Sequence, residues 1–212
     1  MAKKVNQDSL ESSDASSIRS DTPYLKFKMI VDKVLAFTLI IALVPLVLLI
    51  AFIIRIDSAG PMFYKQKRVG SYGKHFVLYK FRTMKIGTPT LSTEEMQKLN
   101  YIPITRFGQI LRKTSLDELP QLINILKGEM SFIGPRPALP SQIDVNTLRE
   151  KYGVYKIPPG LTGLAQVMGR DDIDAKTKVD YDFSYCRNIC LAMDVYVLFL
   201  TVKAVLTARG NK

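Results

Sequence analysis

A stretch of 21 uncharged residues, 34–54, constrains this chain more than any other feature of its sequence. As an α-helix rising about 1.5 Å per residue, it is just long enough for a hydrocarbon core about 30 Å thick. Pro45 stands in the middle of the stretch, where it removes one helical hydrogen bond and crowds the preceding turn, so we expect a kink there. Basic residues flank both sides, namely Lys26, Lys28 and Lys33 before it and Arg55, Lys65, Lys67 and Arg68 after it.

These basic flanks leave two membrane arrangements open. Positive charge marks the cytoplasmic side of a membrane segment. Flanks that are equally basic favour a helix that enters the membrane, bends at Pro45 and returns to the side from which it came. The alternative is an ordinary kinked transmembrane helix, and the residues by themselves divide the two readings nearly evenly.

The composition limits the remainder of the chain. With 212 residues, 47% hydrophobic and 23% charged, it is neither disordered nor a polytopic membrane protein, and it has enough material for one domain with a core. The net charge of +11 implies a polyanionic partner, which composition leaves open among nucleic acid, an anionic lipid surface and phosphate-bearing substrates. Cys186 and Cys190 are too few for a disulfide framework or a zinc site, and we expect two reduced thiols on one helical face, which fits a cytoplasmic location.

The pattern along the chain predicts an α+β fold that is mainly helical. Residues 1–22 are polar and rich in serine, which indicates a disordered tail. Residues 55–90 alternate apolar and basic side chains around two glycines, which predicts a small β-hairpin. Helices are expected at 91–112 with an interruption at Pro103, at 120–127 up to Gly128, and at 174–190, whereas 134–170 is rich in loops. The uncharged run 195–202 is too short to span a bilayer and is expected to be a core helix or an interfacial one.

The adjacent carboxylates Asp117 and Glu118 precede Pro120, which suits the first turn of a helix. One interpretation is purely structural: Asp117 is a helix cap, and Ser115 with Glu118 has the spacing of a capping box. The other is chemical, because two carboxylates at a helix start can hold Mg²⁺ together with substrate phosphates, and one of them can attack phosphorus. The segment alone favours the cap.

Phosphoryl chemistry also needs cations around the carboxylates. Arg112 lies five residues upstream of Asp117, and Arg136 lies in a stiff Gly-Pro-Arg-Pro loop suited to clamping a phosphate, although a rigid turn or a proline-rich ligand has the same pattern. Lys80 and Arg82 are two residues apart and would share one face of a strand. Residues 160–163 (GLTG) could offer backbone amides to a phosphate, but an ordinary turn is the commoner reading.

Taken in order, these segments resemble the small monotopic phosphoglycosyl transferases, bacterial sugar transferases that load undecaprenyl phosphate. The resemblance runs from about residue 28 to residue 206. It rests on an apolar segment with a central proline, a C-terminal apolar helix after an Asp, and the motifs FYKQKRVGSYGKHFVLYKFRTM, LRKTSLDELPQLINILKGEMSFIGPRP and PPGLTGLAQVMGR. No single motif is specific, but the ordered set is.

The resemblance implies a re-entrant membrane helix over 23–56 kinked at Pro45, and a cytoplasmic catalytic domain over 57–212 with interfacial helices. It implies a location at the cytoplasmic face of the bacterial inner membrane, with a UDP-sugar, undecaprenyl phosphate and membrane lipids as partners and no nucleic acid; a homodimer stays open. Asp117 would be the nucleophile and Glu118 its helper, together holding Mg²⁺. Lys80, Arg82, Arg112 and Arg136 would bind phosphates, and Asp182 is the best match to a further family acid, with Asp180 close by.

This chain departs from the family pattern at two places. It has Val44-Pro45 where members often carry Ser-Pro, and residues 171–182 (DDIDAKTKVDYD) are atypical. The rival from a different class is a non-enzymatic, membrane-anchored basic module that binds anionic lipid or nucleic acid. A different phosphotransferase acting on the same lipid is a second, enzymatic rival.

Overall fold

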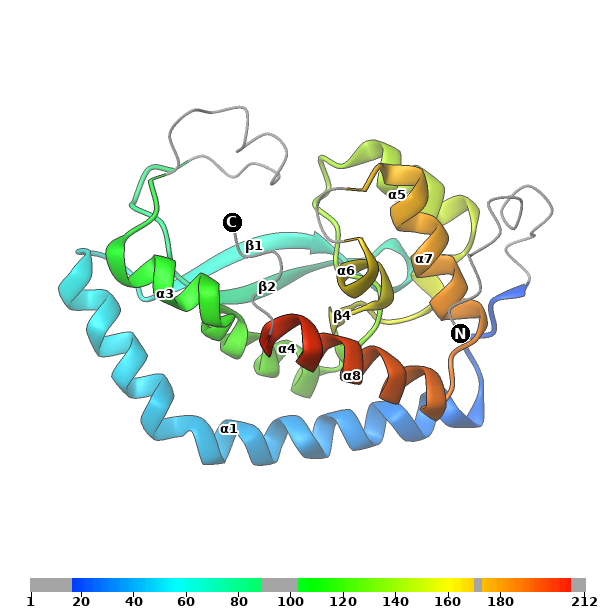
Figure 1. The fold of residues 1–212 in the computed structure, drawn as a ribbon, viewed down its shortest axis with the longest axis horizontal. Helices are drawn as coiled ribbons and strands as arrows, with labels where there is room; N and C mark the ends of the chain where they lie inside the picture. Colours follow the sequence, from blue (N-terminus) through cyan, green and yellow to red (C-terminus); the bar gives the residue numbers. More distant parts are fainter. Residues whose placement is uncertain (1–16, 89–102, 170–172, 207–212) are drawn as a thin grey trace.

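One long helix, α1 (Pro23–Asp57), runs beneath the rest of the molecule in the computed structural model of the protein (Figure 1). The structure describes residues 17–88, 103–169 and 173–206. Thr22 caps α1, because its hydroxyl accepts a hydrogen bond from the amide of Leu25, and Pro23 occupies the first turn. The helix continues through Pro45, and Figure 1 shows that its ribbon bends before it turns up towards the hairpin.

Among the described residues, α1 is the one helix whose length and composition suit a membrane, with a mean hydropathy of 3.2 in its apolar window. It nevertheless packs on the domain along its whole length. Its start, middle and end each join a different hydrophobic cluster, and so the same domain covers one face of α1 from end to end. These clusters contain Leu25 with Val154 and Tyr185, Ala36 with Leu78 and Ile125, and Ile54 with Phe81 and Leu111.

The domain above α1 combines short helices with two small sheets. Strands β1 (Phe63–Val69) and β2 (His75–Phe81) form an antiparallel hairpin around the 3-10 turn η3 (Ser71–Gly73), and β3 (Ser131–Ile133) pairs in parallel with β4 (Gly160–Thr162). The helices are α3 (Arg106–Thr114), η4 (Leu116–Gln121), α4 (Leu122–Lys127), α5 (Ile143–Lys151), η5 (Val154–Lys156), α6 (Leu164–Met168), α7 (Ala175–Arg187) and α8 (Leu191–Leu206).

Most of the predicted elements are confirmed. The fold is mainly helical with a small hairpin, α4 ends at Gly128 in the left-handed conformation (φ 79°), and α7 fills most of the predicted 174–190 helix. Both cysteines are free, but α7 ends at Arg187, so Cys190 lies beyond it and the shared helical face is wrong. Of the predicted 91–112 helix, residues 91–102 lie outside the described residues, and α3 begins only at Arg106.

Two further segments differ from what the sequence predicts. The segment predicted to be rich in loops, 134–170, also contains the helix α5 (Ile143–Lys151), which was not predicted. The buried side chains of α5 are Val145 and Arg149, so the apolar periodicity that marks a helix is missing. The predicted polar tail lies outside the described residues up to residue 16, but residues 17–22 are placed, and Ile18 is packed in the core at 2% exposure.

A buried polar network fastens the first turns of α1 to α8. The ammonium of Lys28 lies 2.6 Å from a carboxylate oxygen of Asp194 and 3.9 Å from Asp32, and all three residues are 6% exposed. Asp194 also accepts hydrogen bonds of 2.6 Å from the hydroxyls of Tyr24 and Tyr185. The buried ammonium of Lys28 therefore depends on Asp194 for its one close charged partner.

Replacing Asp194 by Ala is expected to cost about 3–5 kcal/mol of folding free energy, because it leaves Lys28 buried with only a distant partner. In a chain of this size that is a fall in melting temperature on the order of 10 °C, measurable by thermal unfolding in detergent. Asp144→Ala is the matched control, since Asp144 is exposed on α5. Equal melting temperatures for the two variants would contradict the assignment.

Candidate active site

Asp117 and Glu118 lie inside the 3-10 turn η4 rather than at its cap. The residue before η4, Ser115, has a left-handed backbone (φ 58°, ψ 15°), which separates η4 from α3. The side chain of Ser115 makes no capping hydrogen bond, so the predicted capping box is absent and the cap interpretation of Asp117 is wrong. Neither carboxylate is therefore needed to cap a helix. The side chain of Asp117 is 11% exposed and that of Glu118 is 17% exposed.

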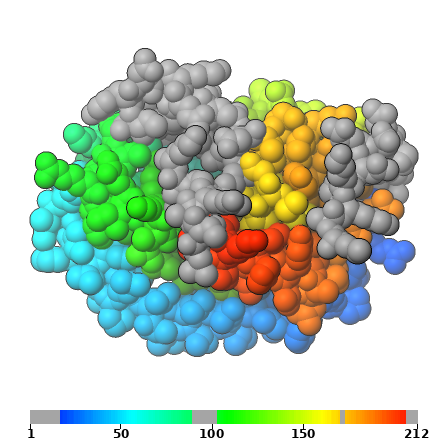
Figure 2. Space-filling view, viewed as in Figure 1, coloured from blue at the N-terminus to red at the C-terminus, as the bar shows by residue number. Residues whose placement is uncertain are grey.

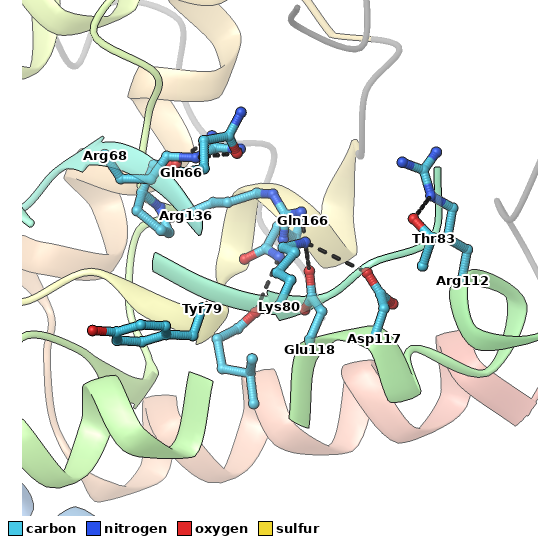
Figure 3. A network of polar contacts seen from close by, with 12 residues as sticks. Gln66, Arg68, Tyr79, Lys80, Thr83, Arg112, Asp117, Glu118, Arg136 and Gln166 are labelled. Carbon is cyan, nitrogen blue, oxygen red and sulfur yellow. Dashed lines mark hydrogen bonds and ion pairs between the residues drawn. The ribbon is translucent and has the colours of Figure 1, made fainter. Parts of the chain in front are cut away.

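Two cations from distant parts of the chain lie on this pair of carboxylates (Figure 3). Lys80 of β2 donates to Glu118 across 2.5 Å, and its ammonium is 3.7 Å from Asp117. Arg136 reaches over from the Gly-Pro-Arg-Pro loop and donates to the same oxygen of Glu118 across 3.2 Å. The structure thus brings together four of the residues that the sequence singled out.

The surroundings move the two carboxyl pKa values in opposite directions. Burial raises the pKa of Asp117 above its usual value, and the opposing pull of Lys80 is not enough to offset it. Burial would also raise the pKa of Glu118, but Lys80 and Arg136 outweigh it and bring that pKa down to about 2. Neighbouring carboxyl groups with diverging pKa values are typical of acid, base and nucleophile assignments in active sites.

Arg112 borders the pair at the end of α3. Its Nε donates to the hydroxyl of Thr83 across 2.9 Å, and its charge opposes part of the rise that burial causes in the pKa of Asp117. Thr83 was not singled out in the sequence, although it follows Arg82 in the KFRTM motif. Arg112 is exposed, so the cluster keeps a cation at its edge within reach of an incoming phosphate.

Arg82 does not join this cluster. It follows the end of β2, is 6% exposed, and donates to the carbonyl of Ser58 beyond α1. Its charged neighbours are Arg55 and Asp57. The expectation that Lys80 and Arg82 share one site fails because the strand ends at Phe81, and the alternation of a strand does not hold past its end.

Asp182 is also placed away from solvent. It lies on α7 at 1% exposure and forms a 2.5 Å ion pair with Arg149 of α5. Neither Asp182 nor the half-turn neighbour Asp180, which is 9% exposed, contacts Asp117 or Glu118 through any hydrogen bond or ion pair in the described residues. The structure thus places Asp182, predicted to bind substrate phosphate, on Arg149 and apart from the carboxylate pair.

The glycine-rich segment 160–163 supports the arginine loop. The amide of Gly160 donates to the carbonyl of Pro135 and the amide of Gly134 donates to Thr162, each across 2.9 Å. A Cβ atom on Gly160 would stand 2.1 Å from the nitrogen of Gly134, so only glycine allows this approach. The Gly160 amide is thus used inside the protein and is not offered to a phosphate.

A magnesium ion fits the donor set of Asp117 and Glu118. Both carboxylates approach the same ammonium, which shows that they are close enough to share one cation. Mg²⁺ commonly uses one or two carboxylates and completes its shell with phosphate oxygens and water. No group of three or more His, Cys, Asp or Glu side chains is found in the described residues, so the remaining ligands would come from the substrate.

The family model described as bacterial sugar transferase matches residues 23–208. The chain belongs to the bacterial sugar transferase family. It is therefore an enzyme, a phosphoglycosyl transferase, which sets aside the non-enzymatic basic module. The matched range contains α1, the carboxylate pair and the arginine loop.

Curated members of the bacterial sugar transferase family resemble most of this chain. It is 37% identical over 195 residues to the exopolysaccharide production protein ExoY of Sinorhizobium fredii, covering 85% of each chain. It is 34% identical to a UDP-N-acetylgalactosamine-undecaprenyl-phosphate N-acetylgalactosaminephosphotransferase of Aeromonas hydrophila, over 99% of this chain and 50% of the relative. An undecaprenyl-phosphate galactose phosphotransferase of Salmonella typhimurium is 38% identical over 84% of this chain and 40% of its own length. The chain thus spans half or less of the latter two.

Proposed function

We propose that this protein transfers a sugar-1-phosphate from a UDP-sugar to undecaprenyl phosphate and releases UMP, as the first membrane step in assembling a bacterial glycan. The observation that carries the proposal is the carboxylate pair of buried Asp117 and half-buried Glu118, held by Lys80 and Arg136 above a long apolar helix. The names of the relatives from Aeromonas hydrophila and Salmonella typhimurium support both the lipid acceptor and the sugar-phosphate group.

In the first step, a carboxylate oxygen of Asp117 attacks the phosphorus that bears the sugar. A bond forms between that oxygen and phosphorus, and the bond from phosphorus to the bridging oxygen of the diphosphate breaks, so UMP leaves with the electron pair. Arg112 and Arg136 hold the phosphate oxygens while charge builds on the leaving group. The raised pKa of Asp117 reflects a carboxylate that burial leaves poorly solvated, which favours its attack.

In the second step, a phosphate oxygen of undecaprenyl phosphate attacks the same phosphorus. The bond to Asp117 breaks, its carboxylate is restored, and the product is a diphosphate-linked sugar lipid. Glu118, with its pKa near 2, stays ionised throughout and keeps Lys80 and Arg136 in place. Asp117 and Glu118 would hold a Mg²⁺ ion, which supplies positive charge to the phosphates when bound.

We further propose that α1 enters the inner membrane from the cytoplasmic face and returns to it. Both ends of α1 pack on one domain, so they lie on the side of the bilayer where that domain lies. The helix exposes large apolar side chains, including Phe37, Ile41, Leu48 and Phe52. Figure 2 shows α8, in orange and red, next to the blue first part of α1. Large apolar side chains of α8, namely Val195, Leu198, Phe199 and Val202, are exposed, as they would be on an interfacial helix.

The test is release of UMP by the detergent-purified protein with Mg²⁺ and a panel of UDP-sugars, with and without undecaprenyl phosphate. With the accepted sugar and no lipid we expect a burst of about one UMP per enzyme, and continuous release after the lipid is added. The burst identifies a covalent intermediate, and the panel identifies the sugar. Turnover that begins only with lipid and shows no burst would exclude the two-step route, and no release from any donor would exclude the reaction.

A further inference from the structure

The loop that carries Arg136 is fixed to the rest of the protein through its backbone carbonyl groups. Pro135 and Pro137 have no N–H, so this backbone can be held mainly through its carbonyl oxygens. Each of four successive carbonyls accepts a hydrogen bond from another part of the chain. The pairs are Pro135 with the amide of Gly160 (2.9 Å), Arg136 with Arg149 Nη1 (2.7 Å), Pro137 with Arg68 Nη1 (3.0 Å) and Ala138 with the amide of Val69 (3.0 Å).

The other two nitrogen atoms of the Arg149 guanidinium contact Asp182. It is 2% exposed, and its Nε and Nη2 both donate to one carboxylate oxygen of Asp182, across 3.0 and 2.5 Å. Asp182 therefore balances the charge and sets the plane of the fork, and Nη1 is aimed at the carbonyl of Arg136. The pair joins α5 to α7, and its hydrogen bond to the site goes to the backbone of the loop, at the carbonyl of Arg136.

Arg68 of β1 repeats this arrangement on the next carbonyl, with Gln66 in the place of Asp182. Figure 3 shows Arg68 beside Gln66. Its Nε and Nη2 donate to the amide oxygen of Gln66 across 3.0 and 2.5 Å, and its Nη1 donates to Pro137. Gln66 is neutral, so the hydrogen-bond partner that orients Arg68 brings no negative charge, unlike Asp182 beside Arg149. Burial and the nearby charge of Arg136 lower the pKa of Arg68 to about 10.

We propose that Arg149, oriented by Asp182, and Arg68, oriented by Gln66, are positioning residues that hold the backbone of Arg136 so that its side chain contacts the diphosphate of a nucleoside diphosphate substrate. The inference rests on the proposed function for the role of Arg136. The side chain of Arg136 is 43% exposed, lies on Glu118, and is the part of the loop that reaches the carboxylate pair. Arg149 and Asp182 are too deeply buried to touch the substrate themselves.

The test is a double-mutant cycle on the affinity of the full-length protein for UDP with Mg²⁺, measured by calorimetry in detergent. Arg136→Met is expected to weaken UDP binding about 10- to 100-fold. Arg149→Lys is expected to weaken it about fivefold to tenfold, since an ammonium keeps the charge beside Asp182 but lacks the planar fork. In the Arg136→Met background, Arg149→Lys should change the affinity by less than about twofold, because both changes remove one interaction.

A second variant protects the test against a folding defect. Arg149→Met with Asp182→Ala removes both buried charges together, which proteins often tolerate, and it should weaken UDP binding as Arg149→Lys does. Arg106→Lys, at an exposed position on α3, is the matched control and should bind UDP as the wild type does. Normal UDP affinity in both Arg149 variants, or in Arg136→Met, would overturn the inference.

The cycle also separates this inference from the proposed function. If no donor yields UMP but the effects of Arg149→Lys and Arg136→Met on UDP affinity fail to add, the transfer reaction is wrong and the positioning role stands. If UMP is released but the two effects add, the transfer reaction stands and Arg149 is only a structural residue.

Discussion

Asp117→Asn is expected to lower sugar-phosphate transfer by about 10⁴-fold or more, because the amide cannot attack phosphorus and no other group takes its place. The burst of UMP in the absence of lipid should disappear together with turnover. Folding should be little affected, since burial already disfavours the charged form of Asp117 and the amide carries no charge. The measurement is UMP release at saturating donor, with and without undecaprenyl phosphate, next to a thermal unfolding curve.

Asp144→Asn is the control for this variant, because Asp144 is an exposed acid on α5, outside the cluster. It should keep the full burst and the wild-type rate. If Asp117→Asn keeps a burst while it stays folded, the nucleophile lies elsewhere, and Glu118 becomes the first residue to examine.

Lys80→Met is expected to lower kcat/KM by about 100- to 1,000-fold and to change its pH dependence. Lys80 lowers the pKa of both Asp117 and Glu118, so its removal lets both pKa values rise. Transfer needs the ionised carboxylates and is lost as the pH falls through their pKa values. The acid limb of the pH profile should therefore move to higher pH, with partial recovery of the rate under alkaline conditions.

Lys67→Met is the matched control, since Lys67 is exposed on the other strand of the same hairpin and pairs with Val77. It should leave the rate and the pH profile unchanged. A lower rate in Lys80→Met without any movement of the acid limb would contradict the electrostatic role and leave Lys80 only a contact for substrate.

Sequence reasoning was most successful where a feature depends on neighbouring residues. A short stretch of sequence is enough to recognise the hairpin, the helix that ends at Gly128 and the apolar α1. The same is true of the adjacent carboxylates Asp117 and Glu118. It did not predict α5, whose inward-facing side chains include Arg149, because a helix that buries a charge lacks the apolar period by which helices are recognised. It also failed for Arg82, which the end of β2 turns away from Lys80.

The sequence by itself determined that this chain holds a membrane-suited helix with a proline inside it, two adjacent carboxylates and a surplus of cations, and the ordered motifs pointed to the family. Only the tertiary structure decided which cations pair with the carboxylates and that both ends of α1 pack on one domain. It also decided that Asp182 forms an ion pair with Arg149. The physical reason is that local patterns report which side of an element is apolar. The partner of a buried polar group, by contrast, is chosen by how elements far apart in the chain pack together.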